Sequence, residues 1–298
     1  MKKTSNKIVF FGSGPVAAKS LELLLDDFEC EAIITKPSTK DEMLTIAPTA
    51  PVFTVNNKSE LDEIIRAEHF TSKLGVLIDF GILVSQEVID SFDFGIVNSH
   101  FSLLPQWRGA DPITFSILSG QQKTGVSLML LVEPMDEGPL LAYAEHEIAA
   151  KTTTPELTKQ LIELSDRLLK EYLPLYLASK ITPHPQTVTE ATLSYSRKLT
   201  KQDGLLDFHK PAAVLEREIR AFIEWPKSRT TIAGKDVVIL QARVEPAGKN
   251  KVGMISKTAN KEISIATKDG TLIIEALKPA GKQAMPASAF LAGYGSKL

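Results

Sequence analysis

Residues 95–105 read Gly-Ile-Val-Asn-Ser-His-Phe-Ser-Leu-Leu-Pro and predict a short buried strand that ends in polar side chains. Asn98 and His100 stand at the carboxyl end of this strand, which is where open α/β sheets bind their ligands. Asp136 follows downstream, beside Gly138. A carboxamide, an imidazole and a carboxylate are together suited to moving an acyl group.

Each of these side chains has a role in such chemistry. Transfer of an acyl group to an amine passes through a tetrahedral intermediate, so the site must stabilise an oxyanion and manage the protons of the attacking nitrogen. Asn98 can donate an N–H to the carbonyl oxygen, a protonated His100 can stabilise developing charge, and Asp136 can support the imidazolium and collect a proton. A structural histidine, a strand-end asparagine and a turn aspartate remain the alternative interpretation.

Alternating strands and helices are predicted on both sides of that stretch. The β-branched and aromatic run at residues 7–11 passes through a glycine-rich turn into helical apolar spacing. This order predicts an α/β fold with a mixed sheet. Strands are expected at residues 7–11, 30–34, 74–78, 95–98, 125–132 and 139–148, and helices at 16–25, 61–66, 155–177 and after Asp111-Pro112.

The chain changes character near residue 180. Residues 181–200 are rich in Thr and Pro, and we expect a linker there. The expected organisation is a catalytic domain over residues 1–180, this linker, and a small β-barrel domain over 201–298. The barrel is expected to contain a helix at 212–222 and strands at 229–232, 237–242, 252–256, 262–267 and 271–276.

Charge is divided unequally along the chain. The net charge is -2, but residues 196–298 hold 18 Lys plus Arg against 10 Asp plus Glu, a net of +8, which leaves -10 for the first 195 residues. A basic carboxyl-terminal part favours a polyanionic partner, nucleic acid being the first candidate. A solvated lysine-rich surface is the alternative explanation.

Cysteine content and hydropathy exclude several classes of protein. Cys30 is the single cysteine, so an internal disulfide and a thiolate metal cluster are excluded, no metal is expected, and a reducing compartment fits. Because no serine lies in a Gly-x-Ser-x-Gly elbow, covalent catalysis is disfavoured. The apolar run at residues 8–11 is too short for a signal peptide, and no stretch is long enough to span a membrane. We expect a cytoplasmic protein.

The composite motif resembles a known family. The string from Asn98 to Pro105, continued by Trp107-Arg108-Gly109, is similar to the signature of the formyltransferases that use 10-formyltetrahydrofolate, and the spacing to Asp136 agrees. Residues 220–226 and 277–285 resemble landmarks of the branch that formylates initiator methionyl-tRNA. The resemblance covers nearly the whole chain. It implies a Rossmann-like formyltransferase domain followed by a barrel that resembles the oligonucleotide-binding (OB) fold.

The resemblance also implies roles for individual residues. The matching catalytic residues are Asn98, His100 and Asp136. The matching folate-contacting residues are Ser102, Leu103, Leu104 and Pro105, with Phe80, Gly81, Ile82 and Leu83 as further pocket walls. The matching acceptor-binding residues are Gly12, Ser13, Val16, Arg108 and Lys282. The implied cosubstrate is 10-formyltetrahydrofolate without a metal, and the implied partner is initiator methionyl-tRNA. The oligomeric state stays open, with a monomer as the default expectation.

This sequence departs from the family pattern in three places. The first turn reads Gly12-Ser13-Gly14-Pro15 where the family usually has Gly-Thr-Pro and an acidic residue, and Asp111 stands where alanine is frequent. Residues 36–43 form a short, charge-balanced segment where the tRNA-dependent branch has a long basic loop. We therefore expect a weaker grip on the acceptor stem at that loop. The first turn is not a dinucleotide fingerprint, because the third glycine is missing.

Two other functions stay open. The same catalytic side chains would serve formylation of a nucleotide-linked amino sugar, and steep salt dependence of acceptor binding would favour tRNA over the sugar. A non-catalytic nucleic-acid-binding protein is the alternative from another class. Replacing His100 with Ala tests that alternative. If the protein only binds nucleic acid, the variant still binds it, and neither wild type nor variant forms a formylated product.

Overall fold

The computed structural model describes residues 6–298 as two compact units. The first unit comprises the described residues up to Pro112 together with Lys123–Glu147 and Thr158–Arg197. The second comprises Ile113–Gln122, Ile148–Leu157 and Lys198–Leu298. Among the described residues, none of the helices combines the length and apolarity that a membrane span requires.

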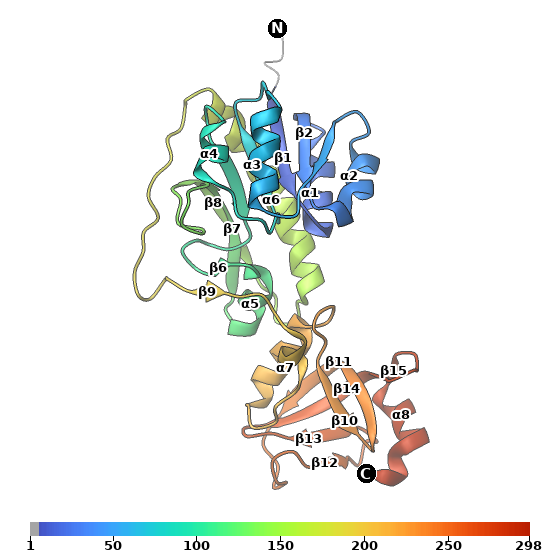
Figure 1. The fold of residues 1–298 in the computed structure, drawn as a ribbon. Coiled ribbons are helices and arrows are strands. Elements are labelled where there is room, and N and C mark those ends of the chain that lie inside the picture. The colour runs from blue at the N-terminus through green and yellow to red at the C-terminus, as the bar shows by residue number, and fades with distance from the viewer. Residues whose placement is uncertain (1–5) are drawn as a thin grey trace. The chain divides into compact units, whose positions relative to one another are not determined.

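A seven-stranded mixed sheet forms the centre of the first unit (Figure 1). Its strand order is β3-β2-β1-β4-β5-β7-β8, in which neighbours from β3 to β5 run parallel and β7 and β8 are antiparallel. The predicted α/β fold with a Rossmann-like mixed sheet is confirmed. The strands are β1 (Lys7–Gly12), β2 (Glu29–Thr35), β3 (Val52–Thr54), β4 (Gly75–Ile78), β5 (Ile96–His100), β7 (Lys123–Leu130) and β8 (Leu140–Glu147).

Apolar packing explains why the middle strands read as uninterrupted hydrophobic runs. A parallel strand covered on both faces needs apolar side chains in both directions, and Ile8 to Phe11 are all buried. The Phe11 ring packs edge to face with Phe80 and Phe92, each at a centroid distance of 5.9 Å. The helices of the first unit are α1 (Pro15–Leu24), α2 (Lys40–Ile46), α3 (Lys58–Ala67), α4 (Gln86–Asp90) and most of α6 (Thr154–Leu177). Helix α5 (Pro112–Ser119) lies almost entirely in the second unit.

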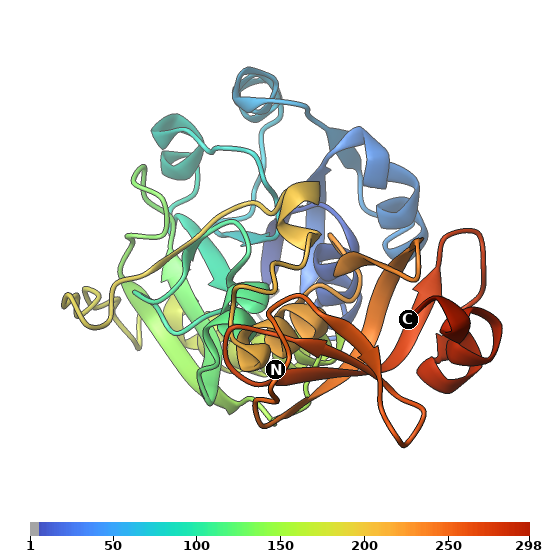
Figure 2. The ribbon, with the colours of Figure 1, turned by 90° about the horizontal axis from the view of Figure 1, so that it is seen from below.

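A curled antiparallel sheet forms the second unit (Figure 2). Its main path is β10-β11-β14-β13-β12, and β15 pairs with the end of β14, so the expected small barrel is present as a curled sheet. The elements are α7 (Ala212–Ala221), β10 (Arg229–Ile232), β11 (Lys235–Glu245), β12 (Ile255–Lys257), β13 (Ile263–Ala266), β14 (Thr271–Pro279), β15 (Met285–Pro286) and α8 (Ala287–Tyr294).

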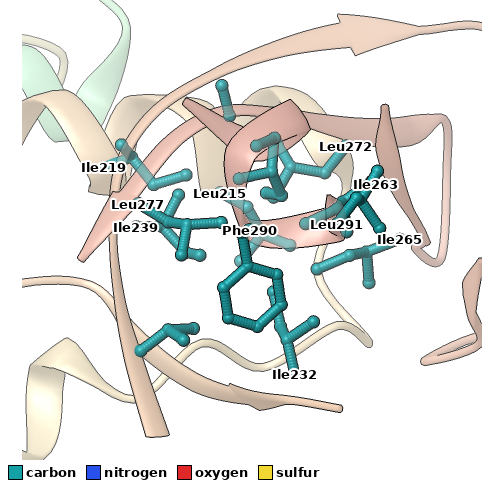
Figure 3. Packing of buried hydrophobic residues seen from close by; sticks show 14 residues of the cluster. Leu215, Ile219, Ile232, Ile239, Ile263, Ile265, Leu272, Leu277, Phe290 and Leu291 are labelled. Carbon is teal, nitrogen blue, oxygen red and sulfur yellow. The ribbon is translucent and has the colours of Figure 1, made fainter. Parts of the chain in front are cut away.

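Branched aliphatic side chains fill the interior of that sheet. Phe290 of α8 is fully buried among them, and Figure 3 shows its ring within the cluster. Leu215 and Ile219 of α7 complete the core from another side, four residues apart on one face of their helix. The second unit therefore has a hydrophobic core of its own.

The predicted linker is not a free tether in this structure. From the end of α6 the chain runs along the first unit to β9 (Tyr195–Ser196), which pairs with β6 (Arg108–Gly109) (Figure 1). His184 exchanges two backbone hydrogen bonds with Leu140, at 2.8 and 2.9 Å. We call residues 183–196 the strap, because hydrogen bonds attach both of its ends to the first unit.

Candidate active site

Strand alternation places Asn98 and His100 on one face of β5. Residues two apart on a strand point the same way, and the intervening Ser99 points to the other face, where its hydroxyl lies 2.7 Å from that of Ser165 on α6. Parallel β4 and antiparallel β7 flank β5 at this level. The two polar side chains consequently lie at the carboxyl edge of the parallel strands, as predicted.

The Asn98 carboxamide is held in an enclosed position with its hydrogen-bonding groups unused. Its residue is 7% exposed, yet no hydrogen bond joins its side chain to another of residues 6–298. The amide atoms of Asn98 are not among the fully buried, unpaired side-chain atoms of residues 6–298, so they keep some contact with solvent. This arrangement fits a donor kept ready for a carbonyl oxygen of a bound molecule.

The His100 imidazole lies between a carbonyl and a carboxylate. Its Nε2 is 3.0 Å from the Trp107 carbonyl oxygen, which can only accept, so Nε2 carries a proton in this arrangement. Its Nδ1 is 3.8 Å from Oδ2 of Asp136, within ion-pair range but beyond a hydrogen bond. Both side chains are nearly buried, at 6% and 10% exposure. A proton on Nδ1 would be stabilised directly by the carboxylate.

Asp136 is fixed by the backbone around it. It has the left-handed φ of 55°, and its Oδ2 accepts a 2.7 Å hydrogen bond from the Gly109 N–H. Two residues later the chain passes so close to β7 that a Cβ on Gly138 would lie 1.7 Å from the Leu130 carbonyl oxygen. Glycine is therefore required at 138, and the tight path through it sets the direction of the Asp136 side chain.

The segment that matches the folate-contacting signature is anchored to β7. The Ser127 hydroxyl donates to the Ser102 carbonyl at 2.8 Å and accepts from the Leu104 N–H at 3.0 Å. Ser102, Leu104 and Pro105 are buried, and Leu103 is half-buried. Of these four side chains, that of Leu103 is the most open to a ligand.

The second expected pocket wall is open to solvent. Phe80 is buried against Phe11, whereas Gly81 is exposed, Ile82 is half-buried and Leu83 is 66% exposed. An exposed leucine next to a buried anchor is the kind of side chain that a flat apolar ligand would cover.

The expected acceptor-binding residues differ in their surroundings. Gly12 is buried, and the buried Ser13 donates its N–H to the Asp79 carbonyl and accepts from the Lys36 N–H, so both hold the turn after β1 together. Val16 is half-buried. Arg108 is 5% exposed, with its guanidinium bonded to Glu137 and Gln186. Lys282 lies in an exposed turn of the second unit.

A charged group that the sequence did not indicate lies beside the first turn. Asp79 follows β4 with a left-handed φ of 47°, and a Cβ on Gly14 would lie 3.7 Å from its Oδ2. Desolvation by the crowded protein, opposed by Lys36 and reinforced by Asp111, raises the pKa of Asp79 to about 6. Part of the residue is exposed to solvent, yet the protein packed around its carboxyl group disfavours the charged form. Asp111 thus does add a carboxylate near the expected acceptor side.

The arrangement can bind and polarise a carbonyl. A carboxamide donor, an imidazole and a carboxylate lie at the edge of one sheet with no nucleophilic side chain among them, which suits direct attack of an amine on a bound acyl group. Within residues 6–298 no group of three His, Cys, Asp or Glu side chains could hold a metal ion.

Comparison with known proteins agrees with this chemistry. The profile described as "Formyl transferase" matches residues 7–173, and that described as "Formyl transferase, C-terminal domain" matches residues 198–295. Curated relatives include methionyl-tRNA formyltransferases from Roseiflexus castenholzii, 32% identical over 95% of each chain, and from Halorhodospira halophila, 34% identical over 96% of each chain.

A solved structure shows the same fold. The N-formyltransferase from Helicobacter canadensis, in complex with folinic acid and dTDP-3-aminofucose, superposes with a TM-score of 0.69 at 17% identity, over 91% of this chain and 99% of that chain. Two matching profiles, full-length relatives and a shared fold all point the same way. The protein belongs to the formyl transferase family.

Proposed function

We propose that this enzyme transfers the formyl group of 10-formyltetrahydrofolate to the α-amino group of initiator methionyl-tRNA, in the cytoplasm, where translation begins. The observation that carries the proposal is the meeting of Asn98, His100 and Asp136 at one sheet edge in a chain that matches methionyl-tRNA formyltransferases over its full length. The proposed division of labour is a formyltransferase domain over residues 1–180, a connection over 181–200 and a tRNA-binding domain over 201–298.

The reaction exchanges one carbon–nitrogen bond for another. The acceptor nitrogen attacks the formyl carbon, the carbonyl oxygen becomes an oxyanion, and the bond to N10 of the folate then breaks. A proton leaves the attacking nitrogen and one is delivered to N10, so the products are the N-formyl amide and tetrahydrofolate. Asn98 donates to the formyl oxygen, and a protonated His100, whose two ring nitrogens face Trp107 and Asp136, stabilises the oxyanion through its charge. Asp136 supports the imidazolium and relays the proton, directly or through water.

Binding roles follow from exposure. Leu83 and Leu103 would cover the pterin ring, with Phe80, Gly81, Ile82, Ser102, Leu104 and Pro105 shaping the pocket through their backbone. Gly12, Ser13 and Val16 would border the aminoacyl group. Lys282 would meet phosphate. The charge-balanced segment after Thr35 forms a short 3-10 turn and the start of α2, whose first turn carries Asp41 and Glu42. These acidic side chains support a weak grip on the tRNA there.

A formylation assay tests the proposal. The protein is incubated with 10-formyltetrahydrofolate and with initiator or elongator methionyl-tRNA, and formyl-methionine is measured after hydrolysis of the ester. Product from the initiator tRNA is expected with wild type and not with His100→Ala. Absence of product from both tRNAs with wild type would refute the proposed function.

Formylation of a nucleotide-linked amino sugar is the second candidate, because the Helicobacter canadensis enzyme has this fold and was solved in complex with dTDP-3-aminofucose. The two candidates differ in salt response. A protein that contacts several phosphates loses acceptor affinity steeply with salt, whereas a sugar nucleotide offers only two phosphates. A nearly flat dependence of acceptor KM on salt, with sugar formylation, would favour the second candidate. Tight tRNA binding without any formylated product would favour a non-catalytic binding protein.

A further inference from the structure

The strap passes beside both loops that contact the catalytic side chains. Near its carboxyl end, the Ser194 hydroxyl accepts the Trp107 N–H at 3.0 Å and the Ser194 carbonyl accepts the Arg108 N–H at 3.0 Å. Trp107 supplies the carbonyl that meets His100 Nε2. The strap therefore fixes the partner of the histidine.

Near its amino end, the strap holds the loop of the carboxylate. Gln186 Nε2 donates to the backbone carbonyls of Asp136 and Gly138, at 2.8 and 2.9 Å. Gln186 Oε1 accepts from Arg108 Nη2 at 2.8 Å, and Arg108 Nη1 pairs with Glu137 at 2.9 Å. The Gln186 carboxamide thus links the loop that carries Asp136 to the loop that carries Arg108 and Gly109. The Gly109 N–H in turn donates to the Asp136 carboxylate.

Only a carboxamide satisfies all these partners. Two backbone carbonyls need donors, and a guanidinium needs an acceptor, so the side chain must provide both kinds of group at its tip. A glutamate could accept from Arg108, but it would place a charged oxygen against the two carbonyls. A leucine would fill the volume and satisfy neither. Arg108 is almost fully buried, so loss of its acceptor would leave a charged group poorly paired.

We propose that Gln186 is a positioning residue for formyl transfer, which holds Asp136 against His100 through the Asp136–Gly138 backbone and the Arg108 guanidinium. The inference rests on the proposed function for its kinetic consequence only. The left-handed backbone of Asp136 needs such support, because a non-glycine residue keeps that conformation only where its surroundings impose it. The Arg108 guanidinium is engaged by Glu137 and Gln186 within the protein.

Kinetics of Gln186→Leu and Gln186→Glu give the first test. Both variants should lower kcat for formylation by about 10- to 100-fold, since small misplacement of a reacting group costs that much, while KM for the folate and the acceptor changes less than about threefold. Gln160→Leu is the matched control, because the exposed Gln160 is also hydrogen-bonded in the first unit, to the half-buried His146. The control should keep the wild-type kcat.

A double-mutant cycle separates positioning from general damage. In the Asp136→Asn background, Gln186→Leu should lower kcat by less than about threefold further, because Gln186 acts through Asp136. Fully multiplied losses would overturn the proposal, as would a wild-type kcat in both Gln186 variants.

Amide hydrogen exchange tests the geometry without any substrate. The Gly109 N–H, protected by the Asp136 carboxylate, should exchange about 10-fold faster in Gln186→Leu than in wild type or in Gln160→Leu. Unchanged exchange would overturn the positioning role even in a fully active enzyme. If wild type formylated neither tRNA but exchange still responded, the proposed function would fail while the structural assignment stood.

Discussion

The carboxyl edge of the first sheet and the core of the second unit differ in the polarity of the side chains that they bury. Around His100 the buried groups are polar, and the backbone takes left-handed conformations at Asp79, Trp107 and Asp136. Around Phe290 the buried groups are aliphatic or aromatic side chains on regular strands and helices. The difference shows where stability and chemistry reside, because local rules of folding are broken where orientation matters more than burial.

The comparison predicts that removing one ring from the second core has the largest effect on stability. Phe290→Ala should lower the free energy of unfolding by about 3–5 kcal/mol, since it removes a fully buried aromatic side chain and leaves a cavity. Denaturant unfolding measures the loss. Val244→Ala, on a half-exposed residue of the same unit, is the control and should change stability by less than about 1 kcal/mol. Equal losses in both variants would mean that the described core is not the stabilising one.

Two asparagine-to-alanine changes sharpen the comparison within the first unit. Asn98→Ala should lower kcat by about 10²- to 10³-fold with little loss of stability, because its amide is used by the reaction and not by the fold. Asn57→Ala should do the reverse, with a loss of about 1 kcal/mol and normal kcat, because Asn57 caps α3 by accepting the Glu60 N–H. Steady-state kinetics and thermal unfolding of both variants distinguish these outcomes. The assignment of Asn98 would be wrong if it behaved like Asn57.

The smallest predicted effect concerns the strained edge at Asp79. Its pKa of about 6 in the fold lies above the value of 3.8 for an unperturbed aspartate, so the folded state holds this proton more tightly. Ionisation of Asp79 therefore lowers the free energy of unfolding as pH rises from about 4 to 6, and this loss remains at higher pH. Asp79→Asn should gain about 1 kcal/mol relative to wild type at neutral pH, a value reduced for solvent exposure, and nothing near pH 4. A gain independent of pH would contradict the raised pKa.

Sequence reasoning succeeded where one local pattern decides the structure. The uninterrupted apolar runs at residues 8–11 and 74–78 predicted β1 and β4, because a strand that is covered on both faces needs apolar side chains on both. Spacing of two residues placed Asn98 and His100 on one face of β5. Helix α2 was not predicted, because its segment carries adjacent charges and buries only Met43.

Contacts between distant segments could not be predicted. Gln186 is 50 residues from Asp136 and 78 from Arg108 along the chain, and nothing in a Thr- and Pro-rich stretch shows which of its side chains will meet them. Burial of Arg108 is equally hidden, because an arginine beside an active-site motif is expected to face the ligand. The polar network depends on how loops close over the sheet, which sequence periodicity does not describe.

The central claim is that His100 and Asp136 act as one unit on the formyl group, and a double-mutant cycle in single-turnover formylation tests it most directly. His100→Ala and Asp136→Asn should each slow the chemical step by about 10²- to 10⁴-fold, and the double variant should be no slower than the worse single variant within about threefold. Losses that multiply fully in the double variant would show that the two side chains work independently and would contradict the account.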